Sequence, residues 1–259
     1  MASLVWGTFG DPPIDTPFSF VLAQGGGRIV LCDCGFMNEG GGATFATRFG
    51  VPTWVSPLRL LERMGIAPGD VTDIVLSHAH FDHAGSIDQF PNAQIYLQKT
   101  ELLSWVEAFA LPPRFSILTD VVDPDDIRAA LEASFQHRLT LIEGDRDNLL
   151  PGLSVRLARG HTMGQQFITL ETARGRYAVA GDCIYSARNL TGEGCGEQQR
   201  YIPLGAGVGS AWDQLLSFNR LETAVGGDRS RIIILHDEAR WSAFERVQEI
   251  EGMGIYKVA

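Results

Sequence analysis

The sequence predicts an α/β protein with sheets inside and helices outside. Runs of apolar and β-branched residues, typical of strands, alternate with segments of helical periodicity in two rounds along the chain. The 259 residues, 45% of them hydrophobic, suffice for one large domain or two half-domains with a sizeable core. Because no low-complexity segment or Pro/Ser-rich linker divides the chain, we expect a single domain over residues 1–259.

The first round begins with two strands joined by a glycine turn at Gly25–Gly27. The expected strands are Phe18–Gln24, Arg28–Cys34, Asp73–Ser77 and Ala93–Gln98; the expected helices run from Pro57 to Met64, from Thr100 to Ala110 and from Pro124 to His137. Ser56 and Pro57 are a typical N-cap and first helical residue. Residues 37–57 are rich in glycine, threonine and aromatic residues, so we expect this stretch to be a structureless loop that lines a substrate site.

The second round contains more strands than helices. The expected strands are Leu139–Glu143, Leu153–Arg159, Gln166–Glu171, Arg176–Ala180 and Arg231–His236; the expected helices are Trp212–Val225 and Trp241–Ile250. Residues 186–211 form a second glycine-rich, irregular stretch, which we also expect to be a substrate loop.

Charge and composition narrow the class of function. The formal net charge is −10, and no run of five lysines or arginines occurs, which disfavours nucleic acid or an anionic membrane as a partner. No window of about 20 apolar residues could span a bilayer, and no signal peptide is recognisable. The four cysteines form no C-x-x-C pair. We therefore expect a reduced, cytoplasmic protein.

The densest chemical motif is Ser77–Gly85, which follows the apolar run Asp73–Leu76. The motif holds three of the six histidines, His78, His80 and His83, together with Asp82. Imidazole and carboxylate are the ligands that suit Zn²⁺ and its neighbours in the first transition row. Four such side chains have no structural reason to coincide in a solvated loop, so the motif predicts a metal site.

Three further donors come from distant parts of the sequence, each directly after an expected strand: His161, Asp182 and His236. Strand ends are where an α/β protein gathers a site. His161 or His236 alone would be a satisfied core histidine, but the motif at residues 78–83 makes both of them candidate ligands. The remaining histidine, His137, lies in a polar stretch and is expected at the surface.

The order His78-x-His80-x-Asp82-His83, His161, Asp182, His236 resembles the metallo-β-lactamase superfamily from about Phe18 to His236. The resemblance implies a four-layer αβ/βα sandwich with a di-metal site, holding two Zn²⁺ or other divalent first-row ions. It implies that His78, His80 and His161 bind one ion, that Asp82, His83 and His236 bind the other, and that Asp182 bridges them. Asp33 resembles the carboxylate that supports this site from behind.

A shorter match indicates a branch of the superfamily. Asp182-x-x-Tyr185 and His236-Asp237 resemble the acyl-homoserine-lactonase and pyridoxolactonase branch. This implies a di-zinc hydrolase that opens a lactone, or a related cyclic ester or amide, by attack of a metal-bound hydroxide. Tyr185 would then stabilise the oxyanion and Asp82 would carry the proton to the leaving group. Relatives in this branch are monomers or dimers, so a homodimer is one alternative.

The substrate remains open at this point. The two irregular stretches offer Phe45, Trp54, Arg188 and Tyr201 as candidate substrate contacts. Apolar side chains would suit an acyl chain or an aromatic ring, whereas an arginine would suit a carboxylate. Tyr185 could instead be a packed aromatic residue, and Cys183 is expected in the core.

Other functions of the same fold compete with the lactonase reading. A thioester hydrolase resembling glyoxalase II or a β-lactam hydrolase would use the same ligands. A redox di-iron protein of this fold is disfavoured for two reasons. Such proteins resemble His-x-Glu-x-Asp rather than His78-x-His80-x-Asp82, and they need a flavodoxin-like partner domain. A nuclease is opposed by the acidic charge. A small-molecule substrate fits best.

Overall fold

The computed structural model describes residues 16–52, 54–192, 200–205 and 207–259. The chain divides into two compact units. Among the described residues, the first unit comprises Phe20–Glu143 and Glu245–Val258; the second comprises residues 16–19, Gly144–Phe244 and Ala259. The single domain expected over residues 1–259 stays a prediction.

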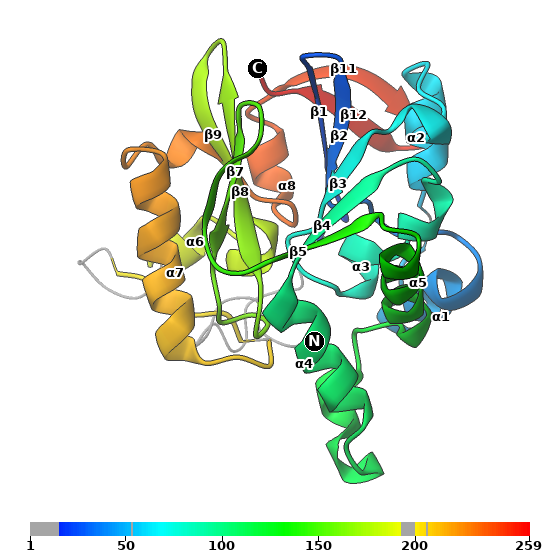
Figure 1. Ribbon diagram of the computed structural model, residues 1–259. Helices are drawn as coiled ribbons and strands as arrows, with labels where there is room; N and C mark the ends of the chain where they lie inside the picture. The colour runs from blue at the N-terminus through cyan, green and yellow to red at the C-terminus, as the bar shows by residue number, and fades with distance from the viewer. Residues whose placement is uncertain (1–15, 53, 193–199, 206) are drawn as a thin grey trace. The chain divides into compact units, whose positions relative to one another are not determined.

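The first unit is built on a five-stranded mixed sheet (Figure 1). Its strands lie in the order β1 (Val21–Gly25), β2 (Arg28–Cys32), β3 (Asp73–Val75), β4 (Gln94–Gln98) and β5 (Leu139–Ile142). β1 and β2 form an antiparallel hairpin, and the remaining neighbours are parallel. The central apolar side chains of β2, β3 and β4 are at most 6% exposed, as expected for parallel strands that are covered on both faces: Val30, Leu31, Ile74, Val75, Ile95 and Leu97.

Three helices of this unit lie where the sequence predicts them: α2 (Pro57–Arg63), α4 (Lys99–Phe109) and α5 (Pro124–Phe135). The short helix α3 (Phe81–Ala84) and the 3₁₀ turns η1 (Pro68–Asp70), η2 (Ile87–Gln89) and η3 (Pro113–Thr119) were not predicted. α5 begins where the Asp123 carboxylate accepts a hydrogen bond from the amide of Asp125, with Pro124 as the first helical residue.

The second unit contains the other five-stranded mixed sheet. Its order is β10 (Ile232–Ile233), β9 (Gly175–Val179), β8 (Gln166–Thr172), β7 (Leu153–Leu157) and β6 (Arg146–Leu150); only β10 and β9 are parallel. β6 was not predicted from the sequence. This unit also contains short helices and 3₁₀ turns. In chain order after β9 they are η4 (Gly181–Cys183), α6 (Arg188–Thr191) and η5 (Arg229–Arg231), and α8 (Glu238–Trp241) follows β10.

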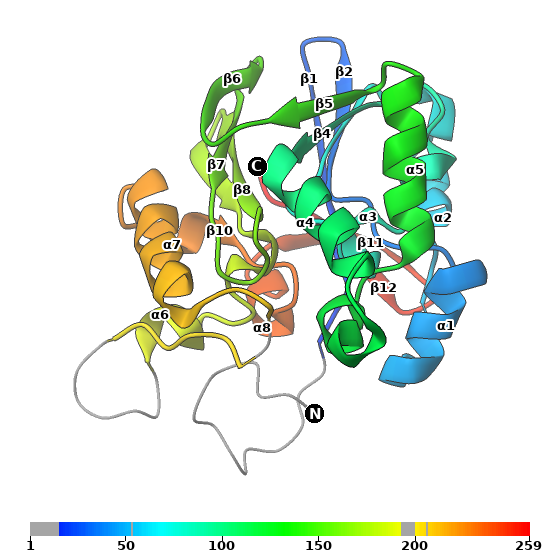
Figure 2. The ribbon, with the colours of Figure 1, turned by 60° about the horizontal axis from the view of Figure 1, so that its bottom comes forward.

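The core of the second unit lies between its sheet and helix α7 (Ala211–Ala224), which runs along the sheet in Figure 2. Ser210 caps this helix by accepting a hydrogen bond from the amide of Asp213. Phe218 and Leu221 are fully buried in one apolar cluster with Phe167 of β8. The amphipathic periodicity that predicts this helix marks its buried face at Phe218 and Leu221, whereas Trp212 and Leu216 are exposed.

Residues 37–57 are not the structureless loop that the sequence predicted. Helix α1 (Gly40–Phe49) occupies half of this stretch. Three glycines at its start weaken the helical pattern, but tertiary packing compensates. Phe45 and Phe49 lie one turn apart and stack on Phe81, with ring centroids 4.5 and 5.6 Å away.

The final helix predicted over Trp241–Ile250 is wrong beyond Trp241. The chain instead forms an antiparallel hairpin of β11 (Glu245–Ile250) and β12 (Met253–Lys257). The two turn residues Glu251 and Gly252 both have positive φ, at 49° and 88°, as a tight hairpin turn requires. Cross-strand pairing thus overrides the helical preference of a glutamate-rich segment.

The α/β class is confirmed: two mixed sheets are flanked by helices. Among the described residues, no helix is both long and apolar enough to cross a bilayer.

Replacing Phe218 with alanine should lower the free energy of unfolding by about 3–5 kcal/mol, because it empties a fully buried site between α7 and the sheet. Urea denaturation followed by circular dichroism measures this change. Phe135→Ala is the matched control, since that ring is 77% exposed and should cost less than about 1 kcal/mol. Equal losses in the two variants would contradict the packing described for α7.

Candidate metal centre

In the first unit, the histidine motif follows β3 directly. Residues 76–84 are buried throughout, and the short helix α3 begins right after His80. The rings of His80 and His83 lie 4.4 and 4.2 Å from that of His78, centroid to centroid. The Nε2 atom of His83 lies 3.4 Å from Oδ2 of Asp82. The unit therefore places four buried side chains of the metal-binding type within six residues of the chain.

Asp33 holds this segment from the end of the neighbouring strand β2. Its Oδ1 accepts a hydrogen bond from the amide of Ser77 (2.6 Å), and its Oδ2 lies 2.8 Å from Nδ1 of His83. Asp33 adopts a left-handed conformation with φ of 59°, which points the carboxylate back across the sheet end. A carboxylate on Nδ1 fixes the ring and leaves Nε2 as its donor toward a metal.

Helix α4 supports the same segment with its inner face. Glu101 is fully buried, and its Oε1 accepts hydrogen bonds from the amide of Ala79 (3.0 Å) and the indole of Trp105 (2.8 Å). The Trp105 ring lies 5.6 Å from that of His80. A buried carboxylate thus anchors the backbone between His78 and His80, a role that the sequence analysis missed.

In the second unit, Asp182 lies between two histidines. Its Oδ2 is 3.2 Å from Nε2 of His161, and its Oδ1 is 3.0 Å from Nε2 of His236. All three residues are buried. Nδ1 of His236 lies 2.8 Å from the carbonyl oxygen of Pro17, which fixes this ring with Nε2 directed toward Asp182.

The register of two parallel strands explains why Asp182 and His236 meet. Val179 of β9 pairs with Ile233 of β10. Each donor follows its strand by three residues, so both leave the same edge of the sheet at the same level. Sequence reasoning predicted both strand ends and therefore predicted this edge.

The donors fit a divalent metal by chemistry and by spacing. Two donors that bind one tetrahedral ion at about 2.0–2.1 Å lie about 3.3 Å apart. The three histidine–carboxylate separations, 3.0, 3.2 and 3.4 Å, match this value. The described residues provide two buried groups of metal-binding side chains, consistent with a binuclear site.

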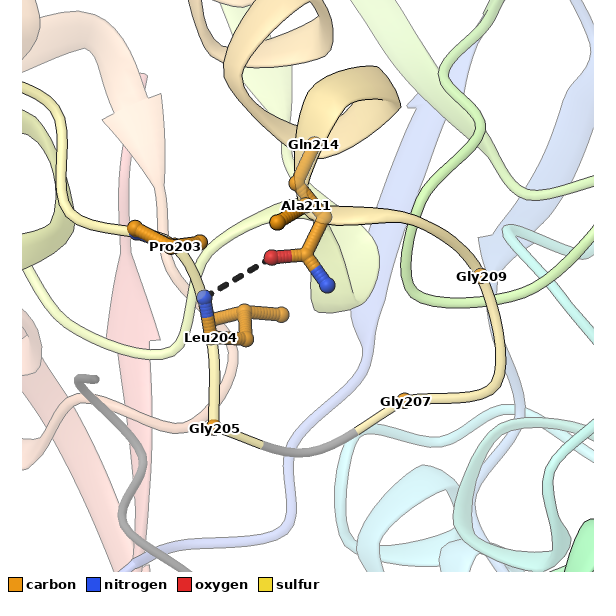
Figure 3. Close-up of a pocket in the computed structure, with 7 residues that line it drawn as sticks. All are labelled: Pro203, Leu204, Gly205, Gly207, Gly209, Ala211 and Gln214. Atoms are coloured by element: carbon orange, nitrogen blue, oxygen red, sulfur yellow. Dashed lines mark hydrogen bonds between the residues drawn. The ribbon is translucent and has the colours of Figure 1, made fainter.

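Helix α7 and a glycine-rich loop position the turn that carries His161. Figure 3 shows Gln214 of α7 hydrogen-bonded to Leu204 of this loop. Gln214 donates to the carbonyl of Gly160 (3.1 Å) and accepts from the amide of Leu204 (2.8 Å). Its Nε2 and Oε1 thereby join the turn to a loop that lines a cavity of about 280 Å³. Gly160 has φ of +135°, and any side chain there would come within 2.5 Å of the Gln214 backbone.

The neighbouring carbonyls of this turn are bound in the same way. Ser217 and Arg220, one and two turns after Gln214 on α7, donate to the carbonyls of Arg159 (2.8 Å) and Leu157 (2.8 Å). The amide of Val208 donates to the carbonyl of His161 itself (2.9 Å). Helix α7 therefore hydrogen-bonds to the backbone that leads from β7 to the candidate ligand His161.

Residues 15–236 match the metallo-beta-lactamase superfamily. The chain belongs to this superfamily. An N-acyl homoserine lactonase of Bacillus thuringiensis is 28% identical over 137 residues, which are 52% of this chain and 48% of the lactonase. The match thus spans about half the length of that curated relative.

Solved structures share the superfamily fold over nearly the whole chain. A quorum-quenching N-acyl homoserine lactone lactonase has a TM-score of 0.69 at 23% identity, covering 98% of this chain and 92% of that one. AidC, a dizinc quorum-quenching lactonase, has a TM-score of 0.64 at 21% identity, covering 95% and 81%. The metallo-β-lactamase fold predicted from the sequence is confirmed.

Tyr185 lies beside the candidate ligands of the second unit. Its ring centroid is 5.6 Å from that of His161 and 5.1 Å from that of His236. Buried Asn189 holds the Tyr185 turn: its Oδ1 accepts from the amides of Tyr185 (3.2 Å) and Ser186 (3.0 Å). Asp237, next to a ligand, accepts from the amide of Ala187 (2.9 Å). Sequence reasoning found the tyrosine but missed Asn189.

The four candidate substrate contacts have different surroundings. Phe45 stacks on Phe81, and Trp54 stacks on Phe36 at 5.3 Å, so both belong to an aromatic cluster in the first unit. Tyr201 hydrogen-bonds to Glu222 and packs on Phe218, centroids 5.8 Å apart. Arg188 begins α6 and is partly buried. Part of the expected loop 186–211, residues 193–199 and 206, lies outside the described residues.

Two cysteines next to site carboxylates remain neutral thiols. Burial raises the pKa of Cys34 and of Cys183 to about 12, each near a carboxylate that adds to the effect. Cys183 belongs to the apolar cluster under α7, as expected from the sequence.

Burial also raises the pKa of Asp126 to about 8, with Asp123 and other carboxylates contributing.

Replacing Gln214 with leucine should weaken metal binding about tenfold, because the carbonyl of Gly160 and the amide of Leu204 both lose their partner and His161 loses its fixed position. Competition titration with a chromogenic zinc chelator measures the affinity. Gln136→Leu, which removes an exposed amide paired with Glu132, is the control. Unchanged metal affinity in Gln214→Leu would contradict a positioning role.

Proposed function

We propose that the chain is a metal-dependent hydrolase that opens lactones. The observation that carries the proposal is the Asp182 carboxylate, which offers one oxygen to His161 and the other to His236. A carboxylate with an imidazole on each oxygen is suited to join two ions. The similarity to an N-acyl homoserine lactonase supports lactones as the substrate class.

The proposed ligand sets follow the superfamily pattern. His78, His80 and His161 hold one ion, Asp82, His83 and His236 hold the other, and Asp182 serves both. Imidazole-rich sets with carboxylates suit zinc, and the dizinc relative AidC supports that choice. When bound, two such ions supply Lewis acidity and a water-derived nucleophile at neutral pH.

The residues around these ligands have separate roles in the proposal. Tyr185, held beside His161 and His236, donates a hydrogen bond from its phenol to the substrate carbonyl oxygen as negative charge develops there. The Asp82 carboxylate takes up the proton that the attacking water loses and passes it to the leaving alkoxide. Asp33 keeps the His83 ring oriented with Nε2 as its donor atom. The substrate is a small molecule, and a cytoplasmic location accords with three free cysteine thiols.

The purified protein should hydrolyse N-acyl homoserine lactones faster than thioesters, β-lactams or aromatic lactones of similar size. A pH-indicator assay of acid release measures all four classes on one preparation. Removal of metal by dialysis against a chelator should abolish the activity, and added Zn²⁺ should restore it. Preferred hydrolysis of a thioester or a β-lactam would replace the lactonase proposal with one of those activities.

Tyr185→Phe should lower kcat about 100-fold with little change in KM, because the lost phenol acts mainly on the developing oxyanion. Its metal content, measured by atomic absorption, should equal that of the wild type. Tyr177→Phe, on β9 and stacked near Arg231, is the control that should keep full activity. A Tyr185→Phe enzyme with unchanged kcat would reduce this tyrosine to a packing role.

A further inference from the structure

Asn189 of helix α6 is fully buried and forms hydrogen bonds in two directions. Toward the turn that precedes α6, its Oδ1 accepts from the amides of Tyr185 (3.2 Å) and Ser186 (3.0 Å). Toward a later part of the chain, its Nδ2 donates to the carbonyl of Ile202 (3.0 Å), and its own carbonyl accepts from the amide of Ile202 (2.9 Å). One asparagine therefore binds the turn of Tyr185 and both backbone polar groups of Ile202.

A second buried carboxamide binds the chain two residues after Ile202. The amide of Leu204 donates to Gln214, as drawn in Figure 3, and Gln214 donates in turn to the backbone carbonyl next to His161. Ile202 and Leu204 are both buried, and a single proline separates them. We call residues 202–204 the linking segment. One of its ends is bound to the tyrosine turn through an asparagine, and the other is bound to the turn of a candidate ligand through a glutamine.

The tyrosine turn depends on such tertiary contacts because the helix that follows it is short. α6 has four residues, far fewer than an isolated helix needs to be stable in water. Gly192 ends this helix with a φ of 66°, and any side chain there would approach the carbonyl oxygen of Arg200 to 2.5 Å. The backbone just before the linking segment therefore packs closely against the end of α6.

We propose that Asn189 and the linking segment are positioning elements that couple the turn of Tyr185 to the turn of His161. The inference rests on the proposed function, in which the tyrosine contacts substrate and the histidine binds a metal ion. Moving either turn alone would break hydrogen bonds of buried groups, which costs free energy. A metal ion that fixes His161 therefore also restricts the motion of Tyr185.

A purely local role for Asn189 leads to a different expectation, and Asn189→Asp separates the two. The aspartate keeps an acceptor oxygen toward the amides of Tyr185 and Ser186. Its second oxygen, however, replaces the amide donor that faces the carbonyl of Ile202, so this contact becomes repulsive. A local cap of the tyrosine turn would tolerate the change, whereas a coupling element would not.

Fluorine NMR of the full chain labelled with 3-fluorotyrosine tests the proposal without a substrate. The chain has five tyrosines, and the resonance of Tyr185 is the one that is missing from Tyr185→Phe. In the wild type, this line should narrow when Zn²⁺ is added, because slow motion of the ring is restricted. In Asn189→Asp it should stay about twofold broader at saturating Zn²⁺. Pro203→Gly, which loosens the linking segment and leaves both carboxamides in place, should have the same effect.

Asn219→Asp, the same substitution at an exposed position of α7, is the matched control and should keep the narrow line. Circular dichroism confirms that each variant is folded, and Pro203→Gly serves alone if Asn189→Asp does not fold. A wild-type line that Zn²⁺ leaves unchanged overturns the proposal, as does a narrow line in the folded variants. A protein that fails to hydrolyse lactones would refute the proposed function but leave this result unaffected.

Kinetics on the preferred lactone provide a second readout. Asn189→Asp should lower kcat about tenfold with little change in KM, because a displaced phenol loses contact mainly with the developing oxyanion. In the Tyr185→Phe background, the same substitution should lower kcat less than about twofold, since it acts through the tyrosine. A full tenfold loss in the double variant would show that Asn189 acts on another group, which would contradict the coupling.

Discussion

The arrangement of the second unit depends on the Asp182 carboxylate, which lies between the imidazoles of His161 and His236. Each oxygen of this carboxylate faces its own partner: Oδ1 lies 3.0 Å from Nε2 of His236, and Oδ2 lies 3.2 Å from Nε2 of His161. Each ring is also positioned by a contact that does not involve the carboxylate. The carbonyl of Pro17 fixes His236 through Nδ1, whereas the turn that carries His161 is held through its backbone.

Strand register converts sequence distance into this geometry. Asp182 and His236 are far apart in the chain, but Val179 pairs with Ile233, and three further residues bring each donor to the same edge. In the first unit, β2 and β3 are parallel neighbours, and Asp33 directly after β2 reaches Ser77 and His83 after β3. Parallel pairing at the end of two strands is thus used in both units, and it explains why donors follow apolar runs in the sequence.

That relation also determines what could be predicted from sequence. Apolar runs that end in histidine or aspartate locate the strands and the candidate ligands together. The supporting residues could not be found, because a glutamate or glutamine within a helix, such as Glu101 or Gln214, looks like a solvated side chain until the packing is known. The β11–β12 hairpin was missed for a similar reason: its strands are stabilised by each other, and the local sequence alone favours a helix. Helix α1 depends on stacking with Phe81, which lies over thirty residues away.

Both units solve the problem of ligand position with a buried polar side chain on a helix. Glu101 of α4 accepts a hydrogen bond from the amide beside His78 and His80, and Gln214 of α7 donates one to the carbonyl beside His161. The polarity is opposite because one segment presents an N–H and the other a C=O. Each contact binds the backbone beside a histidine rather than the imidazole itself. Burying a polar group without a hydrogen-bond partner costs free energy. A shift of either backbone segment would leave Glu101 or Gln214 without its partner, so each contact favours one backbone position.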